Sequence, residues 1–537
     1  MIVRSSSAGS RGMHRWTAIL MAVLVPAGSL TAQQTAAPDI KVSVRLVTLD
    51  VVVTDKKGNL LTNLGQGDFS VYEDAQPQTI RTFEPPSAHR MPQSPDGKAE
   101  VVVASSADLA KIGNAPVTIL VLDELNTAFS DMSFARQSLE KYLRAQPEVL
   151  NQPTALLVAS NTKFQQLQDY TQKRADVLAA LKAHFPEYPW KMANGGSGGQ
   201  NAVERIVQSL SSLLQIAEAT RGTPGRKNVI WVGANAPGVD LSTADPETAK
   251  EMNDVVKRVT QTMLATRVTV FYIDPTVNSS ATVGIMVPDD SSDGTPFVAT
   301  DPFSADVNFN QFAPATGGRI FTSRNDVNNE IANSIDRGNT YYSLSYSPAN
   351  KSEDAAKFRS IRIKLSNPDL IATTREGYYP EAENANNMEA DSTLATSQRM
   401  SMLQMELSQA ATSAMAYNGL SVTAEKSADK KLWQISVDGR NLSWTPAPGG
   451  QTVAEVTAMA VAFDDRPNGG KGRVSAGPKS KLLGHVSREL QSEQKSDAAH
   501  GAVTFQLPLQ VPAGATRVRI VMRDAVSGRI GTLDVAP

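Results

Sequence analysis

The sequence predicts a protein that combines α/β and all-β parts. It has a doubly wound, Rossmann-like sheet domain flanked by or inserted in a β-sandwich, followed by a C-terminal immunoglobulin-like β-sandwich. Three observations predict this. From Pro116 onward, strand-like and helix-like patterns alternate, as in a mainly parallel sheet covered by helices. Residues 40–84 and 340–380 show two-residue alternation without helices, and residues 416–537 contain apolar runs separated by turns, which is typical of a sandwich.

The first 32 residues have the pattern of an export signal. An apolar stretch from Trp16 to Val25 precedes a small-residue cleavage site at Leu30–Ala32. The basic residues before the apolar stretch are Arg4, Arg11 and Arg15. The stretch is too short for a membrane span, which needs about 20 residues. We expect an exported protein, periplasmic or extracellular, with no transmembrane segment after cleavage. Translation begins at Met1 or at Met13.

Composition excludes several classes of function. The chain of 537 residues is long enough for about three domains. Its 52 basic and 54 acidic residues nearly cancel, which argues against a dedicated nucleic-acid binder. The absence of cysteine excludes disulfides, thiolate zinc sites and a cysteine nucleophile.

The first β segment is predicted to share a sandwich with a later one. A long strand is expected from Lys41 to Asp55, with a phase change near Thr48, and two shorter strands form a hairpin-like pair at Phe69–Glu73 and Gln78–Phe83. Three strands on each side are too few to bury a core alone. We therefore expect them to pair with the later strands, so that the α/β unit is inserted between. The later strands are expected at Tyr341–Ser347, Phe358–Leu365 and Leu370–Arg375.

Val117–Asp123 is the stretch around which the α/β domain is predicted to form. A continuous apolar run of this length is typical of a strand covered on both faces. Ser130 and Asp131 are expected to cap the helix that follows. In open α/β sheets, ligands bind beyond the carboxyl ends of the strands. Asp123 is therefore expected at a rim that a ligand can reach.

The rest of the α/β domain alternates between the two element types. The strongest helix pattern is at Asn201–Thr220, whose apolar residues keep to one face. The other expected helices are 131–145, 175–185, 248–265, 310–315 and 327–335, and the other expected strands are 154–159, 227–233, 268–273 and 319–321.

The C-terminal third is predicted to begin with a polar connection and a Met-rich helix at 398–415. Strands are expected near 420–424, 433–437, 453–463, 503–507 and 517–523. In the last of these, arginines alternate with apolar residues, which predicts a solvated strand face carrying Arg517, Arg519 and Arg523.

Several motifs from about Val42 to Tyr379 resemble the VWFA-related domain family of Acidobacteria. In order, they read VVVTDKKGNLLTNLGQGDFSVYED, LVLDELNT, PGRKNVIWVG, ATGGRIF, YYSLSYSP and REGYY. The resemblance implies a von Willebrand factor A (VWA)-like fold for the α/β domain and a role in adhesion or assembly. The domains are then a signal peptide (1–32), a β module (40–84), a linker (85–114), the VWA-like domain (115–339), strands pairing with the module (340–380), a linker and helix (381–415) and a sandwich (416–537).

The resemblance also implies a site in which oxygens from several loops hold a divalent cation, Mg²⁺ or Ca²⁺. The first loop of the family reads Asp-x-Ser-x-Ser. Asp123 matches its Asp and Thr127 its second Ser, whereas Leu125 replaces the first Ser and cannot coordinate. Asn126 can supply an amide oxygen instead. Ser197, rather than the mid-helix Ser209, is the candidate for the second-loop hydroxyl.

The predicted metal site is degenerate, because the carboxylate of a third loop is missing. Gly233-Ala234-Asn235 stands where the family has its Asp, and Asn235 is a poor substitute. The alternative is that Asp123 accepts backbone N–H groups of its own loop. No other cofactor is expected.

Other motifs are weaker. Asp289–Gly294 resembles the start of a calcium loop, but Thr300 stands where the closing acid belongs. Gly195–Gly199 matches G-x-S-x-G without the strand that this motif needs before it. No HExxH or catalytic pairing occurs, and His184 is expected to end a helix.

The function expected from these features is that of a non-enzymatic, exported interaction protein. It would present the loops around Asp123, Ser197, Asn235 and Asp274 to a partner, most simply a protein, and the β-sandwiches would act as spacers. Two alternatives stay open: an exported hydrolase that uses the same sheet edge, and a purely structural component of the cell envelope.

Overall fold

The computed structural model describes residues 46–93, 101–190, 200–234, 238–242, 245–276, 301–303, 306–322, 326–348, 357–380, 396–427, 432–466, 480–495 and 501–537. The predicted signal peptide lies outside these residues, as do the start of the first expected strand and the two loop motifs at 195–199 and 289–294.

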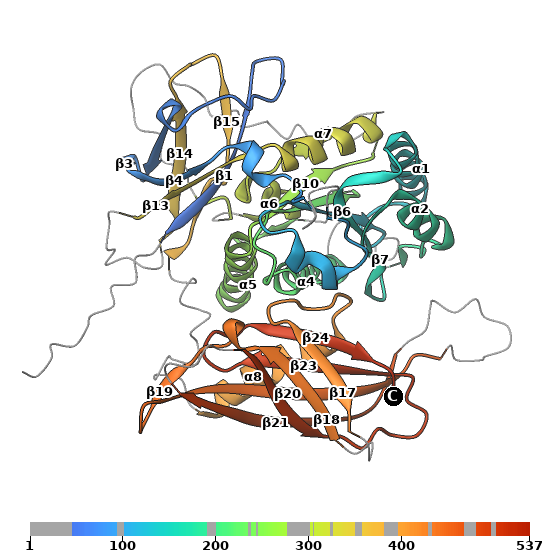
Figure 1. The fold of residues 1–537 in the computed structure, drawn as a ribbon. Coiled ribbons are helices and arrows are strands. Elements are labelled where there is room, and N and C mark those ends of the chain that lie inside the picture. Colours follow the sequence, from blue (N-terminus) through green and yellow to red (C-terminus); the bar gives the residue numbers. More distant parts are fainter. Residues whose placement is uncertain are drawn as a thin grey trace, which may run out of the picture. The chain divides into compact units, whose positions relative to one another are not determined.

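A six-stranded sheet lies at the centre of the α/β domain, in the order β12-β10-β8-β5-β6-β7 (Figure 1). Its neighbouring strands are parallel except β6 and β7, which are antiparallel. The strands are β5 (Val117–Asp123), β6 (Val149–Ala159), β7 (Phe164–Lys173), β8 (Lys227–Val232), β10 (Val268–Ile273) and β12 (Ile320–Phe321). The chain order runs outward in both directions from β5, so the switch point of a doubly wound sheet lies between β5 and β8. The predicted mixed α/β architecture is confirmed.

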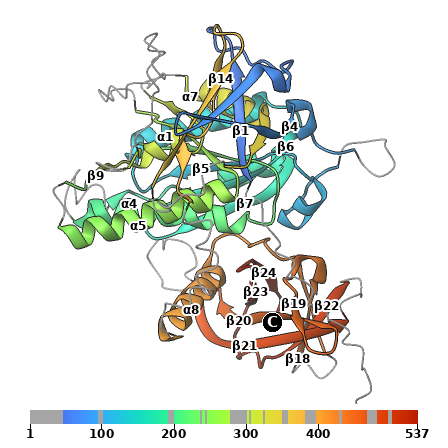
Figure 2. The same ribbon diagram turned by 90° about the vertical axis from the view of Figure 1, so that its left-hand side faces the viewer.

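Helices cover both faces of this sheet. α4 and α5 run side by side along one face (Figure 2) and enclose a core with Ile119 and Val121 of β5. α1, α2 and α7 pack on the other face, against Leu120 and Leu122. The helices are α1 (Phe129–Ala145), α2 (Arg174–Ala183), α4 (Gln200–Ala219), α5 (Pro246–Ala265), α6 (Phe312–Ala315) and α7 (Val327–Asn339). Because β5 is covered on both sides, all seven of its residues are buried.

The predicted capping of the helix after β5 is wrong. α1 begins at Phe129 with Ala128 as its N-cap, and no side chain caps it. Ser130 and Asp131 therefore lie inside the first turn, where the Asp131 carboxylate suits the positive end of the helix dipole. α5 begins at Pro246, two residues before the expected start, and the Asp245 carboxylate caps it by accepting a hydrogen bond from the Thr248 N–H at 3.0 Å.

The all-β strands before and after this domain form two four-stranded sheets, ordered β15-β1-β13-β4 and β16-β14-β2-β3. Each sheet combines strands from both segments, and Glu84 of β4 lies opposite Ser343 of β13. The strands are β1 (Val47–Thr54), β2 (Phe69–Glu73), β3 (Gln76–Gln78), β4 (Ile80–Glu84), β13 (Tyr342–Tyr346), β14 (Arg359–Leu365), β15 (Ile371–Thr373) and β16 (Gly377–Tyr378). The chain thus leaves the sandwich at β4, forms the α/β domain, and returns at the neighbouring strand.

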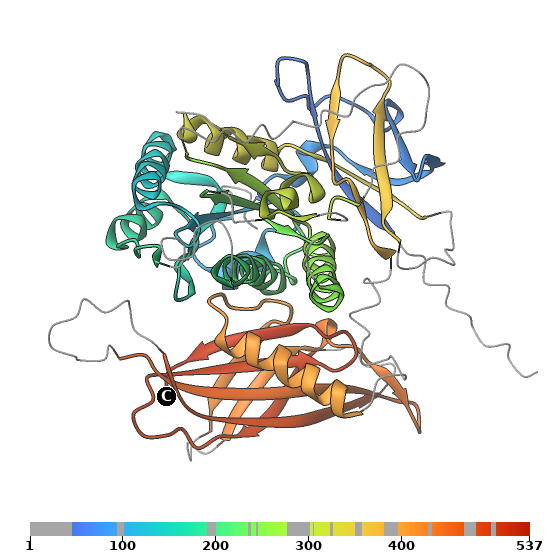
Figure 3. The same ribbon diagram turned by 180° about the vertical axis from the view of Figure 1, so that it is seen from behind.

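Two further sheets make up the C-terminal part. β17 (Val422–Lys426), β18 (Leu432–Asp438) and β22 (Ala502–Pro508) form one. The other contains β19 (Thr445–Ala447), β20 (Gln451–Asp464), β21 (Lys481–Lys495), β23 (Arg517–Asp524) and β24 (Ile530–Val535). α8 (Thr396–Thr412) lies across a face of the five-stranded sheet (Figure 3). The immunoglobulin-like character of this part stays a prediction.

The expected solvated face of β23 is wrong for two of its three arginines. Arg519 is 6% exposed and its Nη2 lies 2.6 Å from Asp534 Oδ2. Arg523 is 4% exposed and its Nε lies 2.9 Å from Glu406 Oε2 of α8. Buried charges need such partners, which the alternation pattern cannot reveal. Within the described residues, no helix is both long and apolar enough to cross a membrane.

Candidate functional site

Asp123, at the carboxyl end of β5, accepts hydrogen bonds from its own loop. Its Oδ1 receives the backbone N–H groups of Leu125 at 3.1 Å and Asn126 at 3.0 Å. The Asn126 Nδ2 lies 2.9 Å from Oδ2 and 3.2 Å from Oδ1. The carboxylate therefore holds the turn that ends the central strand, as a carboxylate in an Asx turn does.

The same carboxylate is bonded to the neighbouring strand. The indole Nε1 of Trp231, on β8, donates to Asp123 Oδ2 at 3.0 Å. Both residues are fully buried. Directly after β8, a Cβ on Gly233 would lie 2.4 Å from the Cβ of Asp123, so the backbone approaches too closely for any side chain there. Tyr272 of β10 donates from its hydroxyl to the Gly233 carbonyl at 2.7 Å.

The structure contradicts the expectation that Asp123 lies at an accessible rim. Asp123, Asn126 and Thr127 are all 2% exposed or less. Thr127 Oγ1 accepts the backbone N–H of Ala234 at 2.8 Å. These three side chains join the ends of β5 and β8 in the interior, and a partner cannot touch them.

The donors and acceptors around Asp123 do not fit a divalent cation. Two backbone N–H groups, the Asn126 amide and the Trp231 indole already donate to its two oxygens. Asn126 directs its Nδ2 to Asp123 and to Ser209 Oγ, while its oxygen faces the Arg205 guanidinium, which is buried. A second cation beside Arg205 would be repelled, and hard cations need oxygen ligands that are free to coordinate. In the part of the chain that the structure describes, no three acidic or histidine side chains gather as a metal site.

Burial and hydrogen bonding act on Asp123 in opposite directions. Burial raises the pKa of its carboxyl to about 6, although the hydrogen bonds from Asn126 and Trp231 lower it. At neutral pH the group is therefore ionised, as its set of donors requires.

The other predicted residues lie apart from this network or outside the described residues. Asp274, after β10, is 7% exposed and accepts from the Thr276 N–H at 2.9 Å and its hydroxyl at 2.7 Å. Burial raises the pKa of Asp274. It closes a local turn and presents little surface. Ser197 and Asn235 fall outside the described part of the chain.

A second buried carboxylate anchors a loop that the sequence analysis did not single out. Glu124 Oε1 lies 2.8 Å from His184 Nε2, and Glu124 Oε2 accepts the backbone N–H of Glu187 at 3.0 Å. Arg136 of α1 donates to the His184 carbonyl at 2.8 Å. His184 does follow the last residue of α2, as expected, but its ring also ties the following segment to the end of β5.

That segment, residues 184–190, is called the rim loop here, and it exposes three aromatic side chains. Phe185 is 85% exposed, Tyr188 64% and Trp190 47%. The loop is also tied to the end of β6, because Asn161 Nδ2 donates to the Tyr188 carbonyl at 2.7 Å. The signal in the sequence was HFPEYPW, in which aromatic residues alternate with prolines just before a Gly-rich stretch. The loop anchored to the ends of β5 and β6 therefore exposes aromatic side chains, whereas Asp123 and Asp274, which were expected to be accessible, are buried.

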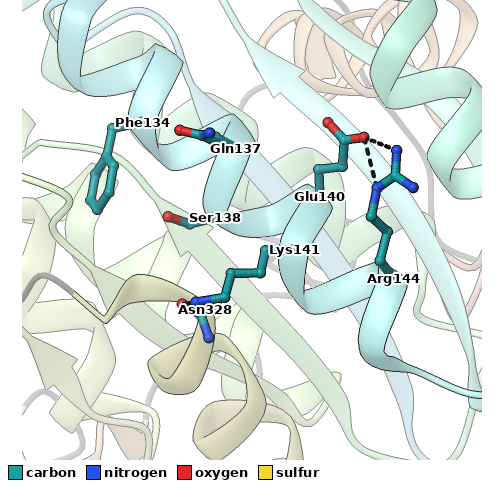
Figure 4. A pocket seen from close by; sticks show the side chains of 7 residues that line it. All are labelled: Phe134, Gln137, Ser138, Glu140, Lys141, Arg144 and Asn328. Atoms are coloured by element: carbon teal, nitrogen blue, oxygen red, sulfur yellow. Dashed lines mark hydrogen bonds and ion pairs between the residues drawn. The ribbon is translucent and has the colours of Figure 1, made fainter.

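A hollow of about 510 Å³ lies elsewhere, along α1 near the start of α7 (Figure 4). Six of the seven residues that line it have polar or charged side chains, and Arg144 pairs with Glu140 at 2.6 Å. Lys141 Nζ lies 3.3 Å from Asn328 Oδ1. The hollow contains none of the candidate residues, and its charges are largely paired, so we assign it no function.

No protein-family model and no curated protein matches the chain. Among solved structures, it is similar to the SpRpn10 VWA domain, with 11% identity and a TM-score of 0.16, over 30% of this chain and 90% of that one. It is also similar to the human COPII-coat protein Sec24c, with 10% identity and a TM-score of 0.20, over 82% of this chain and 47% of that one. Scores this low support no argument from either structure.

Proposed function

We propose that this chain is an exported, non-enzymatic interaction protein with a VWA-like α/β domain, which binds a protein partner through the rim loop. One observation carries the proposal: Phe185, Tyr188 and Trp190 are exposed on a loop that is anchored to the ends of the central strands.

Anchoring makes these aromatic side chains suited to binding. Trp and Tyr are enriched in the energetic centres of protein interfaces, because they bury a large area with few rotatable bonds. Ordering a loop on binding costs free energy, and a loop already held by buried polar contacts avoids part of that cost. Glu124 holds the start of the rim loop and Asn161 holds its middle.

The buried network around Asp123 has a supporting role in this proposal. It fixes the ends of β5 and β8 without a metal ion, so the rim keeps its shape in the absence of Mg²⁺ or Ca²⁺. The order of the six strands, with its switch point beside β5, supports the VWA-like assignment.

The hydrolase alternative has less support. The imidazole nearest the rim, that of His184, is bonded to the Glu124 carboxylate. Within the described residues, His184 makes no hydrogen bond to a serine or threonine hydroxyl, which a nucleophile and its base would require. The envelope-component alternative is tested together with the proposal.

The proposal is tested by site-specific photo-crosslinking in cells. A photoreactive residue at position 185 is expected to capture one protein from the envelope fraction. The matched control carries the same residue at position 371, where Ile371 of β15 is 40% exposed. Equal capture at both positions, or none at 185, contradicts a partner at the rim and leaves the structural role.

The captured protein is then purified and titrated against the chain. Phe185→Ser and Trp190→Ser are each expected to weaken binding at least about 10-fold, as truncated interface aromatics do. Ile371→Ser is expected to leave it unchanged. N-terminal sequencing of the protein from the envelope fraction tests export, with cleavage after Ala32 as the expected result.

A further inference from the structure

β21 is a long strand that pairs with β20 at one side of the five-stranded sheet. It is paired with β20 on one side along its whole length, from Lys495 opposite Gln451 to Lys481 opposite Asp464. In the described chain, no strand is paired with its other side. From Gly484 to Leu490, the outward backbone N–H and C=O groups have no strand partner among the described residues, and such an edge is a template for another strand.

The charges of β21 are unevenly distributed along the strand, which ends on Lys495. Lys481 and His485 lie in its first half, and Glu489 and Glu493 in its second half. Arg488 lies between the two halves. His485 and Glu489 are exposed, four residues apart, and lie on the same face, opposite Val461 and Thr457 of β20.

We infer that two copies of this chain associate by antiparallel pairing of their β21 edges about a two-fold axis at Ser487. A two-fold axis normal to the sheet keeps each face on its own side, so only residues of the same face come opposite each other. With the axis at Ser487, His485 of each copy lies opposite Glu489 of the other. The imidazole N–H of His485 can then donate a hydrogen bond to the Glu489 carboxylate of the other copy, and the symmetry forms this cross-strand pair twice.

The register with its axis at Val486 opposes neither acid of β21 to a basic residue of β21, and several registers beyond Ser487 oppose like charges. An axis at Arg488 places that residue against its own copy, and an axis at Glu489 does the same for the glutamate. An axis at Gln491 places Glu489 opposite Glu493. Like charges directly opposite each other destabilise a sheet. The register at Ser487 avoids all of these contacts.

An irregularity limits the length of the paired stretch. The register of β21 on β20 shifts between Ala462 and Phe463, opposite Gly484 and Leu482. Pairing is therefore expected to be regular from Gly484 to Leu490 and less so beyond. An interface of one strand from each copy is smaller than the roughly 1,600 Å² of a standard interface, so we expect weak, reversible association.

Sedimentation velocity of the full mature chain, from about 1 to 200 μM, tests the inference. We expect a monomer at the low end and a dimer at the high end. Glu489→Lys, which places a lysine opposite His485, is expected to weaken dimerisation at least about 10-fold. The double variant His485→Glu/Glu489→Lys places opposite charges across the axis and is expected to restore the dimer.

Glu425→Lys is the matched control, because Glu425 is an exposed glutamate on a strand of the other C-terminal sheet. It is expected to dimerise as the wild type does. A chain that stays monomeric at every concentration overturns the inference. The inference is also overturned if Glu489→Lys and Glu425→Lys weaken dimerisation equally. The same holds if the double variant His485→Glu/Glu489→Lys is folded but stays monomeric. Phe185→Ser, which tests the rim, is expected to leave dimerisation unchanged, so the two proposals fail separately.

Discussion

The indole of Trp231 donates to the carboxylate of Asp123 at 3.0 Å, in a part of the molecule that solvent does not reach. This bond joins the carboxyl ends of β5 and β8, the two strands on either side of the switch point of the sheet. It holds these two strand ends together through the carboxylate that the resemblance implies as a metal ligand.

Replacement of Trp231 by Phe removes this donor and leaves a buried carboxylate with fewer partners. We expect the free energy of unfolding to fall by about 1–3 kcal/mol, the usual effect of an unsatisfied buried polar group. Urea denaturation followed by circular dichroism measures it. A fall no larger than a few tenths of a kcal/mol contradicts the structural role of the bond.

Replacement of Asp123 by Ala leaves buried donors of Leu125, Asn126 and Trp231 without their acceptor. We expect a loss of more than about 2 kcal/mol of unfolding free energy. Titration calorimetry of the wild type with Mg²⁺ and with Ca²⁺ is expected to show no binding heat. If the wild type gives a binding heat that Asp123→Asn does not give, the hypothesis of a metal site at Asp123 is supported.

Replacement of Gly233 by Ala forces its new methyl group against the Asp123 side chain. The Cβ would also lie 2.7 Å from Thr127 Oγ1, so the loop or the strand end must shift. We expect a loss of at least about 1–3 kcal/mol, the usual cost of overpacking. Gly67→Ala is the matched control, since its Cβ would meet nothing within 4 Å.

His89 predicts a loss of stability in acid. Its ring is buried, stacks on Tyr341 at 4.2 Å, and has no hydrogen-bond partner at either nitrogen among the described residues. Burial lowers the pKa of His89 below its ordinary value of 6.5, and the charges of Arg267 and Arg226 lower it further, against the opposing effect of Glu84. Asp50, on β1, also opposes the shift.

A lowered histidine pKa means that folding favours the neutral ring. The contribution of His89 to stability is therefore complete above pH 6.5 and is lost as the pH falls through its folded pKa. Thermal unfolding from pH 8 to pH 5 measures it. His89→Phe, which can keep the stacking on Tyr341, is expected to flatten the profile. An unchanged slope in this variant assigns the acid sensitivity to other groups.

The sequence was most informative where burial is complete on both sides. The unbroken apolar run of β5 predicts a buried strand, and the one-sided apolar pattern of α4 predicts a helix. No other secondary structure would bury those residues. The α/β class follows from their alternation. By contrast, β7 and β21 are edge strands with many polar residues, FQQLQDYTQK and KLLGHVSRELQSEQK, and neither strand was predicted. Their backbone pairing, rather than their side chains, holds them in place.

The position of Asp123 was predicted correctly, but its burial and its hydrogen-bond partners were not. Asp123 does lie where β5 ends, yet sequence cannot show that Trp231, more than 100 residues away, would supply its hydrogen bond. A buried Trp usually finds a hydrogen-bond partner for its N–H. The sequence therefore predicts that Trp231 has a partner, but it does not identify Asp123 as that partner. The aromatic residues of the rim loop can also be read from the sequence. No motif there indicated that this loop would differ from an ordinary polar connection.

Glu84 and Ser343 lie opposite each other in an antiparallel ladder, although some 260 residues of chain separate them. Opposed Cα atoms in such a ladder are about 5 Å apart. The α/β domain thus leaves and rejoins its sandwich at nearly one point. A pull applied along the chain from either side is borne by the strands on which that point lies, and tension reaches the inserted domain only after those strands separate.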